Sequence, residues 1–92
     1  MEISYDEKKN QTNIKDRNLP FSDVINFDFS TALIWHDTRI RYSELRMVAI
    51  GFVLKRLHVV CFNETQDGIR VISFRKANVR EIKKYESQIT KN

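Results

Sequence analysis

Hydrophobic and polar residues follow two different periods along the chain, and the period changes near residue 30. From there, four β-rich runs of strand length follow one another: TALIW, LRMVAIGFV, RLHVVCF and IRVISF. The links between them (HDTRIRYSE, LK and NETQDG) are short, and Asp67–Gly68 is a turn signal. The middle two runs are apolar on both alternating faces, as in central strands that helices cover. The pattern predicts a four-stranded antiparallel sheet.

Helices are predicted before this sheet. In YDEKKNQTNIKDRNLPF, Asp6 is a suitable N-cap, Asn18 suits a left-handed C-terminal stop, and Pro20 prevents continuation. This helix has almost no apolar stripe beyond Ile14, so contacts with the rest of the domain must stabilise it. The next segment, FSDVINFDF, predicts a short helix with Ser22 as its cap.

A third helix is predicted at the C-terminal end. Asn78 can cap its N-terminus, and Glu81, three residues later, can complete a capping box. Its narrow apolar stripe consists of Val79, Ile82, Tyr85 or Glu86, and Ile89. The order of elements predicts one α+β domain over residues 1–92, with N-terminal helices, the antiparallel sheet and a C-terminal helix.

Composition supports a globular chain and adds little about chemistry. Hydrophobic residues make up 41% and charged residues 30%. There is no apolar run near the roughly 18 residues that span a bilayer, and no signal-peptide pattern, so we expect a cytoplasmic protein without a membrane partner. The single cysteine, Cys61, lies in the apolar run LHVVCF, which favours a buried, unreactive thiol.

The net charge of +4 is unevenly distributed. Residues 69–92 hold seven Lys or Arg and two acidic residues, a local +5, so the other residues sum to −1. The seven basic residues are Arg70, Arg75, Lys76, Arg80, Lys83, Lys84 and Lys91. Such a patch suits a nucleic acid or an acidic protein partner.

Motifs for nucleotide cofactors and metals are missing from the sequence. It has no GxxxxGK[ST], GxGxxG, HExxH or paired CxxC pattern, so we expect neither a cofactor nor a metal. Ser73, His36 and Asp37 have the residue types of a hydrolase triad, but almost any chain of this size contains such a set, so these residues alone do not indicate a hydrolase.

The basic cluster in RVISFRKANVREIKKYE is more informative. Strict strand alternation places Arg70 and Arg75 on opposite faces, with Lys76 at the strand exit and Arg80 in the first helical turn. Arginine binds phosphate in bidentate geometry, and lysine binds it as a point charge. The alternative is an ordinary solvated helix face, which is the better interpretation of Lys83–Lys84.

Three residues elsewhere could join this cluster. Glu44 and Arg46 share a face at the entry of the second strand, and could lie beside the cluster if that strand neighbours the last one. They could also simply pair with cross-strand neighbours. Tyr85 offers a phenol, either as a proton donor or as an aromatic residue at the edge of the core. The residues alone support a small basic α+β domain with a nucleic acid or acidic partner.

Three segments, in order and at matching spacing, resemble the BrnT toxins of bacterial type II toxin–antitoxin systems. YDEKKNQTNIKDRNLPF is similar to the pattern W-D-x-x-K-x-x-x-N-x-x-K-H-G-[VI]-x-F. DTRIRYSELRMVAIG is similar to D-x-R-x-x-Y-G-E-x-R-x-x-x-x-G. RVISFRKANVREIKKYE is similar to R-[IV]-I-S-[AV]-R-[KR]-A-x-x-x-E-x-x-x-Y-E, the most specific of the three.

The resemblance implies a fold similar to RelE-type ribonucleases and a toxin that cleaves RNA, inhibits translation and arrests growth. It also implies a BrnA-type antitoxin, a DNA-binding protein that neutralises the toxin and represses the shared operon together with it. The toxin would then bind operator DNA only through that complex, a hetero-oligomer built on an antitoxin dimer.

Metal-free RNA cleavage needs an activated 2′-hydroxyl, stabilisation of the charged phosphorane and protonation of the leaving 5′-oxygen. Our hypothesis assigns charge stabilisation to Arg70 and Arg75, the general base to Glu44 or Glu81, and the general acid to Tyr85. The remaining RNA-binding residues in this hypothesis are Lys76, Arg46 and Arg80.

Several positions depart from the family pattern. Arg17 stands where the pattern has His, and arginine cannot act as a base at neutral pH. Ser43 replaces a glycine, and Phe74 replaces a small residue and could narrow the neighbouring site. Two other functions stay open: a non-catalytic basic protein-binding module, and a DNA-binding regulator, although no helix-turn-helix pair is visible.

Overall fold

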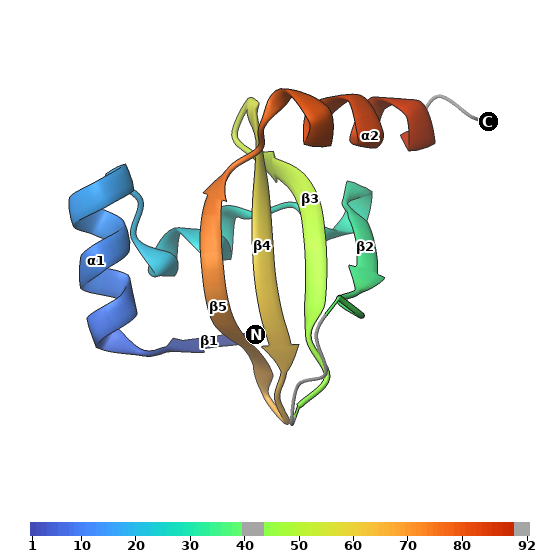
Figure 1. Cartoon of the computed structure of the whole chain (residues 1–92). Coiled ribbons are helices and arrows are strands. Elements are labelled where there is room, and N and C mark those ends of the chain that lie inside the picture. The colour runs from blue at the N-terminus through green and yellow to red at the C-terminus, as the bar shows by residue number, and fades with distance from the viewer. Residues whose placement is uncertain (40–43, 90–92) are drawn as a thin grey trace.

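The chain has an α+β architecture, which a computed structural model describes for residues 1–39 and 44–89 (Figure 1). Its elements in chain order are β1 (Glu2–Tyr5), α1 (Glu7–Arg17), η1 (Phe21–Asn26), η2 (Phe29–Thr31), β2 (Leu33–His36), β3 (Met47–Val53), β4 (Arg56–Glu64), β5 (Gly68–Lys76) and α2 (Val79–Ile89). The elements η1 and η2 are short 3-10 helices. The predicted fold class is confirmed. Ser43 and Lys91, which entered the sequence argument, lie outside the described residues.

One five-stranded sheet forms the centre of the molecule, with the strand order β1-β5-β4-β3-β2. The four predicted strands are present and pair consecutively in antiparallel fashion, from β2 to β5. The prediction of a purely antiparallel, four-stranded sheet is wrong at one edge, because β1 adds a fifth strand parallel to β5. This pairing joins segments near the two ends of the chain, so no local pattern indicated it. The likeness to RelE-type folds stays a prediction.

Gly68 allows β1 to approach the sheet closely. A Cβ atom at this position would overlap the backbone carbonyl oxygen of Glu2, so any other residue would displace the edge strand. The backbone N–H of Gly68 also donates to the hydroxyl of Thr65 at 3.0 Å, which closes the predicted turn before β5. Gly68 therefore serves both the turn and the parallel strand pair.

Apolar side chains cover both faces of the sheet. The inner face, which η1 and η2 cover, includes Ala49, Val60, Phe62, Val71 and Phe74. The outer face includes Trp35, Val48, Ile50, Val59 and Cys61. Helix α2 packs on the outer face and crosses one end of the sheet (Figure 1). The other end of the outer face is therefore not covered by α2.

Helix α1 lies beside the β1–β5 edge and is held there by two buried asparagines rather than by an apolar stripe (Figure 1). The side-chain amide of Asn13 donates to the carbonyl oxygens of Leu19 at 2.8 Å and Phe74 at 2.9 Å. The side-chain oxygen of Asn10 accepts the backbone N–H of Phe21 at 2.8 Å. These bonds explain how so polar a helix docks on the domain.

The predicted ends of α1 are confirmed, whereas the predicted cap of the next helix is wrong. Asp6 caps α1 by accepting the backbone N–H of Lys8, and Asn18 ends it in the left-handed conformation with φ 53°. Ser22 lies inside η1, which begins after Pro20 and has no side-chain cap. A tight 3-10 turn replaces the expected helix, because Pro20 fixes the extended backbone directly before it.

The predicted capping box of α2 is present. Asn78 accepts the backbone N–H of Glu81, and Glu81 accepts the backbone N–H of Asn78, both at 2.9 Å. Two residues of the predicted apolar stripe, Val79 and Ile89, are exposed and so add little to the packing of α2 on the sheet. Buried packing comes from Tyr85 together with the half-buried Ile82.

A cation–π contact also joins α2 to the sheet: the Lys84 ammonium lies 3.9 Å from the centre of the Trp35 ring. No helix within the described ranges is long and apolar enough to cross a bilayer.

Candidate functional site

A β-bulge in β5 brings Arg70 and Arg75 to the same face of the sheet. The register with β4 shifts between Cys61 and Phe62, so that Arg75 lies opposite Val59 while Arg70 lies opposite Asn63. Val59 and Asn63 point to the same side of β4, and cross-strand partners share a face. The prediction that Arg70 and Arg75 lie on opposite faces is wrong, because the bulge adds one residue between them and inverts the alternation.

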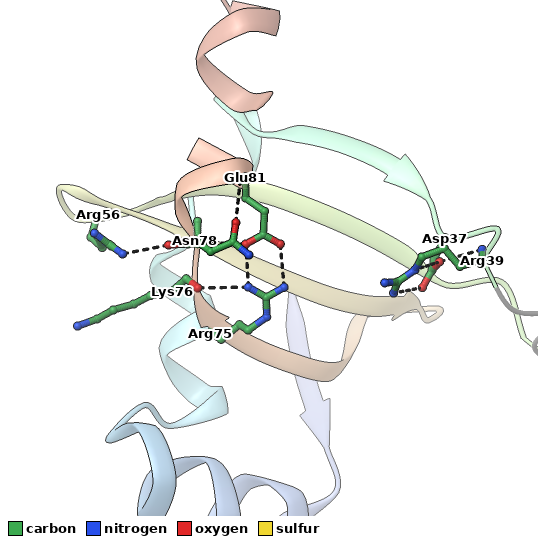
Figure 2. Close-up of polar contacts among 8 residues, drawn as sticks. Asp37, Arg39, Arg56, Arg75, Lys76, Asn78 and Glu81 are labelled. Atoms are coloured by element: carbon green, nitrogen blue, oxygen red, sulfur yellow. Dashed lines mark hydrogen bonds and ion pairs between the residues drawn. The ribbon is translucent and has the colours of Figure 1, made fainter. Parts of the chain in front are cut away.

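Arg75 is fixed at the point where β5 leads into α2 (Figure 2). Its guanidinium donates two hydrogen bonds of 2.8 Å to the two carboxylate oxygens of Glu81. The hydrogen bond from Arg75 holds the pKa of Glu81 below its usual range, and the same bond raises the pKa of Arg75. The pair is therefore fully ionised at neutral pH, and Glu81 is poorly suited to act as a base.

A second bidentate ion pair lies where β2 ends and the chain turns toward β3 (Figure 2). The carboxylate of Asp37 is buried and accepts the Nε–H and an Nη–H of Arg39, both at 3.0 Å. The Arg39 side chain is nevertheless 80% exposed. Asp37 thus anchors an arginine whose charge stays at the surface, and that charge acts against the raised pKa of Arg75.

Glu44 and Arg46 lie near the basic residues of β5, but not through the direct pairing of the second predicted strand with the last one. Strand β3 does not neighbour β5, because β4 lies between them. The link runs through β4: the side-chain amide of Asn63 donates to Glu44 at 2.9 Å, and Asn63 is the cross-strand partner of Arg70. Glu44 is exposed at this end of the sheet.

Cys61 lies at the middle of the outer face, between its cross-strand partners Val48 on β3 and Ser73 on β5. Arg46, two residues before Val48, lies on the same side of the chain as Val48 and therefore on the outer face. Burial raises the pKa of this thiol, the charge of Arg46 opposes the rise, the carboxylate of Asp37 adds to it, and Arg39 and Lys9 oppose it more weakly. The thiol stays protonated at neutral pH, in agreement with the prediction that it is unreactive, although it is half-buried rather than buried.

Two predicted phosphate ligands are directed elsewhere. Lys76 is the cross-strand partner of His58 and points away from Arg75 (Figure 2). Arg80 lines a separate hollow on α2 together with Val79 and Lys83. The predicted convergence of four cations is therefore only partial. Arg75 and Arg80 lie at the start of α2, where the charge of Arg80 helps to lower the pKa of Glu81, whereas Arg70 lies farther along β5 and Lys76 points away.

Tyr85 and Phe74 are both part of the packed interior. The Tyr85 ring is 6% exposed, its hydroxyl donates to the carbonyl oxygen of Thr31 at 3.0 Å, and its edge meets Phe52. Phe74 is completely buried in the inner face, so the concern that it narrows the neighbouring site is unfounded.

The structure thus gathers cations along the outer face, from Arg75 at the start of α2 to Arg70 toward the end that α2 leaves open. We call this set the arginine face, and its members are Arg39, Arg46, Arg70 and Arg75. The guanidinium groups of Arg39 and Arg75 are oriented by their carboxylate partners, and oriented guanidinium groups suit the planar bidentate recognition of phosphate. Within the described ranges, no group of three His, Cys, Asp or Glu side chains could hold a metal ion.

Sequence reasoning missed Arg39 as a member of the arginine face, and it did not consider Lys9, which lies on α1. A signal for Arg39 was present in the D-x-R spacing of DTRIRYSELRMVAIG, which lets a buried aspartate hold an arginine two residues later. No signal in the sequence showed that the charge of Lys9, on α1, would affect the pKa of the Cys61 thiol on β4.

Comparison with known proteins now gives this geometry a context. A family model described as "Ribonuclease toxin, BrnT, of type II toxin-antitoxin system" matches residues 5–81. None of the curated proteins compared with the chain matches it. The match includes α1, the whole sheet after β1 and the capping box of α2, and it confirms the resemblance that the three sequence segments indicated.

Proposed function

Because the chain belongs to the BrnT family of ribonuclease toxins from type II toxin–antitoxin systems, we propose that it is an endoribonuclease that cleaves RNA at the arginine face. The observation that carries this proposal is the bulge in β5, which places Arg70 and Arg75 on one face of the sheet. Arg46 and the Asp37–Arg39 pair lie at the edge of the same face. Four cations on one face match the charge of successive RNA phosphates.

In the proposed reaction, the 2′-oxygen attacks the adjacent phosphorus, and the bond from phosphorus to the 5′-oxygen breaks. The products are a 2′,3′-cyclic phosphate and a 5′-hydroxyl. Glu44, exposed beside Asn63 and Arg70, takes the proton of the 2′-hydroxyl. The leaving 5′-oxygen receives a proton from solvent, which reaches the open face. No metal ion takes part.

The arginines stabilise the charge that develops on the phosphorane. We assign the scissile phosphate to Arg70 and Arg75, and the flanking phosphates to Arg39 and Arg46. Arg75 suits this task because Glu81 fixes its orientation before RNA binds. Glu81 is in this account a positioning residue and not the base. Losing one such charge contact typically costs about 3 kcal/mol, or about a hundredfold in rate.

The proposal assigns structural or peripheral roles to three residues that the sequence hypothesis placed in the reaction. Tyr85 anchors α2 through the hydrogen bond from its hydroxyl to Thr31. This hydroxyl could reach a substrate only if α2 left the sheet, so Tyr85 has no part in the reaction. Lys76 and Arg80 lie outside the arginine face.

The test of this function uses purified protein and a labelled RNA with excess EDTA. We expect cleavage that the chelator does not reduce, and fragments that end in a 2′,3′-cyclic phosphate and begin with a 5′-hydroxyl. Loss of cleavage in EDTA, restored by added divalent metal, would refute the metal-independent mechanism. RNA that is bound but left intact would favour the non-catalytic binding module.

Membership of a type II family implies a protein antitoxin. We propose that a BrnA-type antitoxin neutralises the toxin, supplies the DNA contact for repression of a shared operon, and forms the dimer on which the complex assembles. Controlled expression should arrest growth and translation, and co-expression of the antitoxin should prevent both. Binding of duplex DNA by the toxin alone, with a steep salt dependence, would favour the DNA-binding regulator instead.

A further inference from the structure

A groove runs between α1 and β5, next to the arginine face but not part of it. Its volume is about 370 Å³, within the range of pockets that hold small ligands. The residues that matter for its chemistry are Lys9, Thr12 and Arg17 on α1, and Ile72 and Ser73 on β5.

The groove exists because the sheet edge changes partner part way along β5. Strand β1 pairs with β5 only as far as Val71. Beyond that point α1 takes the place of a strand, and Asn13 spans the gap to the carbonyl oxygen of Phe74 at 2.9 Å. A polar side chain of this length holds the helix away from the strand, and the bulge at Ile72 lies two residues before Phe74.

Basic side chains dominate the rim of the groove. Lys8, Lys9 and Arg17 line it, against the single acid Asp6. The carboxylate of Asp6 already accepts the backbone N–H of Lys8 as the helix cap. Arg17 is oriented by a 2.9 Å hydrogen bond to the side-chain oxygen of Asn13. The groove therefore has a net positive charge and one pre-positioned guanidinium.

The groove is continuous with the arginine face. Ser73 lines the groove and is also the cross-strand partner of Cys61, at the middle of the outer face. The charge of Lys9, on the other wall, acts on the same thiol as the charges of Arg39 and Arg46. Ser73 therefore belongs to both surfaces, and an extended polyanion on the arginine face can continue past Ser73 into the groove.

We propose that this groove binds one nucleotide of the RNA that flanks the cleaved bond. Lys9 and Arg17 hold its phosphate, while its base lies over the half-buried side chain of Ile72. The inference rests on the proposed ribonuclease function and adds to it a second binding site, reached by RNA that crosses the edge of β5. Cleavage itself takes place on the arginine face, so the groove sets affinity and minimum substrate length.

The test measures affinity against RNA length. Two oligonucleotides carry a 2′-deoxy substitution at the cleaved position so that they bind without reacting; the longer one extends the shorter by two nucleotides. We expect wild-type protein to bind the longer one about tenfold more tightly. The double variant Lys9→Gln/Arg17→Gln should lose that gain, and the salt slope of its affinity should fall by about 0.7 for each phosphate contact removed.

A matched control is available on the same helix. Lys15 is exposed in the last turn of α1 and does not line the groove, so Lys15→Gln should keep the full gain with length. The variant Arg17→Lys keeps the charge and should keep most of the gain. Thermal unfolding of each variant shows whether α1 is still docked.

The outcomes separate the two proposals. Cleavage of the unmodified short RNA by wild-type protein supports the ribonuclease proposal. The groove proposal is overturned if the affinity of wild-type protein for RNA does not rise with RNA length, or if the double variant shows the same rise as wild type. If wild-type protein cleaves neither RNA, the ribonuclease proposal itself fails. If the double variant loses affinity only for the antitoxin, the groove belongs to a protein interface and the RNA assignment is wrong.

Discussion

Arg75 and Glu81 are joined by two hydrogen bonds of 2.8 Å, and Glu81 at the same time accepts the backbone N–H of Asn78 at 2.9 Å. One carboxylate therefore begins α2 and fixes the orientation of an arginine on the sheet. The start of α2 and the arginine face are coupled through this single side chain, so a change at Glu81 should affect both stability and RNA cleavage.

The first prediction concerns Glu81→Gln, which keeps a capping side chain but loses the charge. Because Arg75 lowers the pKa of Glu81, this carboxylate stabilises the fold above the unfolded pKa of about 4.3, and its contribution is lost as pH falls through the folded value. We expect the variant to be about 1 kcal/mol less stable at pH 7 and to lose less stability than wild type between pH 5 and 3. Urea unfolding across that range measures both.

The control for this prediction is Glu64→Gln, at the exposed end of β4, which should keep the wild-type pH dependence. Cleavage by Glu81→Gln should fall about tenfold, because Arg75 is no longer held in one orientation. Equal pH slopes for wild type and Glu81→Gln would contradict the assigned role of the pair.

The second prediction concerns Asn13, whose side chain is 5% exposed and bridges two carbonyl oxygens. Asn13→Ala leaves the Phe74 carbonyl oxygen without this donor, and we expect a loss of about 2 kcal/mol in the free energy of unfolding. Chemical denaturation measures it. The control is Gln11→Ala, on the exposed side of the same helix. Surface substitutions usually change the free energy of unfolding by less than about 0.5 kcal/mol, and we expect a loss within that range. Similar losses for the two variants would show that α1 does not depend on the bridge.

The third prediction separates the two roles considered for Tyr85. Tyr85→Phe removes only the hydrogen bond to Thr31, which is worth about 1 kcal/mol of stability. We expect RNA cleavage at the wild-type rate, because the hydroxyl lies under α2 and does not reach the substrate. A folded Tyr85→Phe protein that no longer cleaves RNA would restore Tyr85 as the general acid.

The fourth prediction is a pH dependence that arises at His58. Burial lowers the pKa of this imidazole, and the charges of Arg56 and Lys76 act in the same direction. The unfolded chain, with a pKa of about 6.5, therefore binds a proton that the folded chain does not, and stability falls as pH decreases below that value. Melting temperatures from pH 7.5 to 5.5 should show this fall.

Two histidine variants locate the effect. His58→Gln should flatten the pH dependence between pH 7.5 and 5.5, whereas His36→Gln, at an exposed position at the end of β2, should keep it. The opposite pattern would assign the titration to another group.

Local signals in the sequence predicted the features of the fold that depend on neighbouring residues. Asp6 and Asn18 mark the ends of α1, and Asn78 with Glu81 marks the start of α2, because a cap satisfies backbone groups within one turn. The four consecutive strands were predictable for the same reason: short links and β-rich runs determine their pairing locally.

Features that depend on distant residues could not be predicted. The pairing of β1 with β5 joins residues 2–5 to residues 68–71, and the bulge at Ile72 shows only in the register with β4. Since the bulge decides which face each side chain takes, strict alternation misplaced Arg70 relative to Arg75. The buried contacts of Asn13 were equally invisible, because a polar residue on a polar helix gives no sign of burial.

The central claim is that RNA is cleaved on the arginine face, and one measurement tests it most directly. Rates of RNA cleavage are compared for Arg70→Gln and for Arg80→Gln, an equally exposed arginine on α2 that lies outside this face. We predict a loss of about a hundredfold for Arg70→Gln and a wild-type rate for Arg80→Gln, with both proteins folded. A wild-type rate for folded Arg70→Gln, or an equal loss in both variants, would contradict the account.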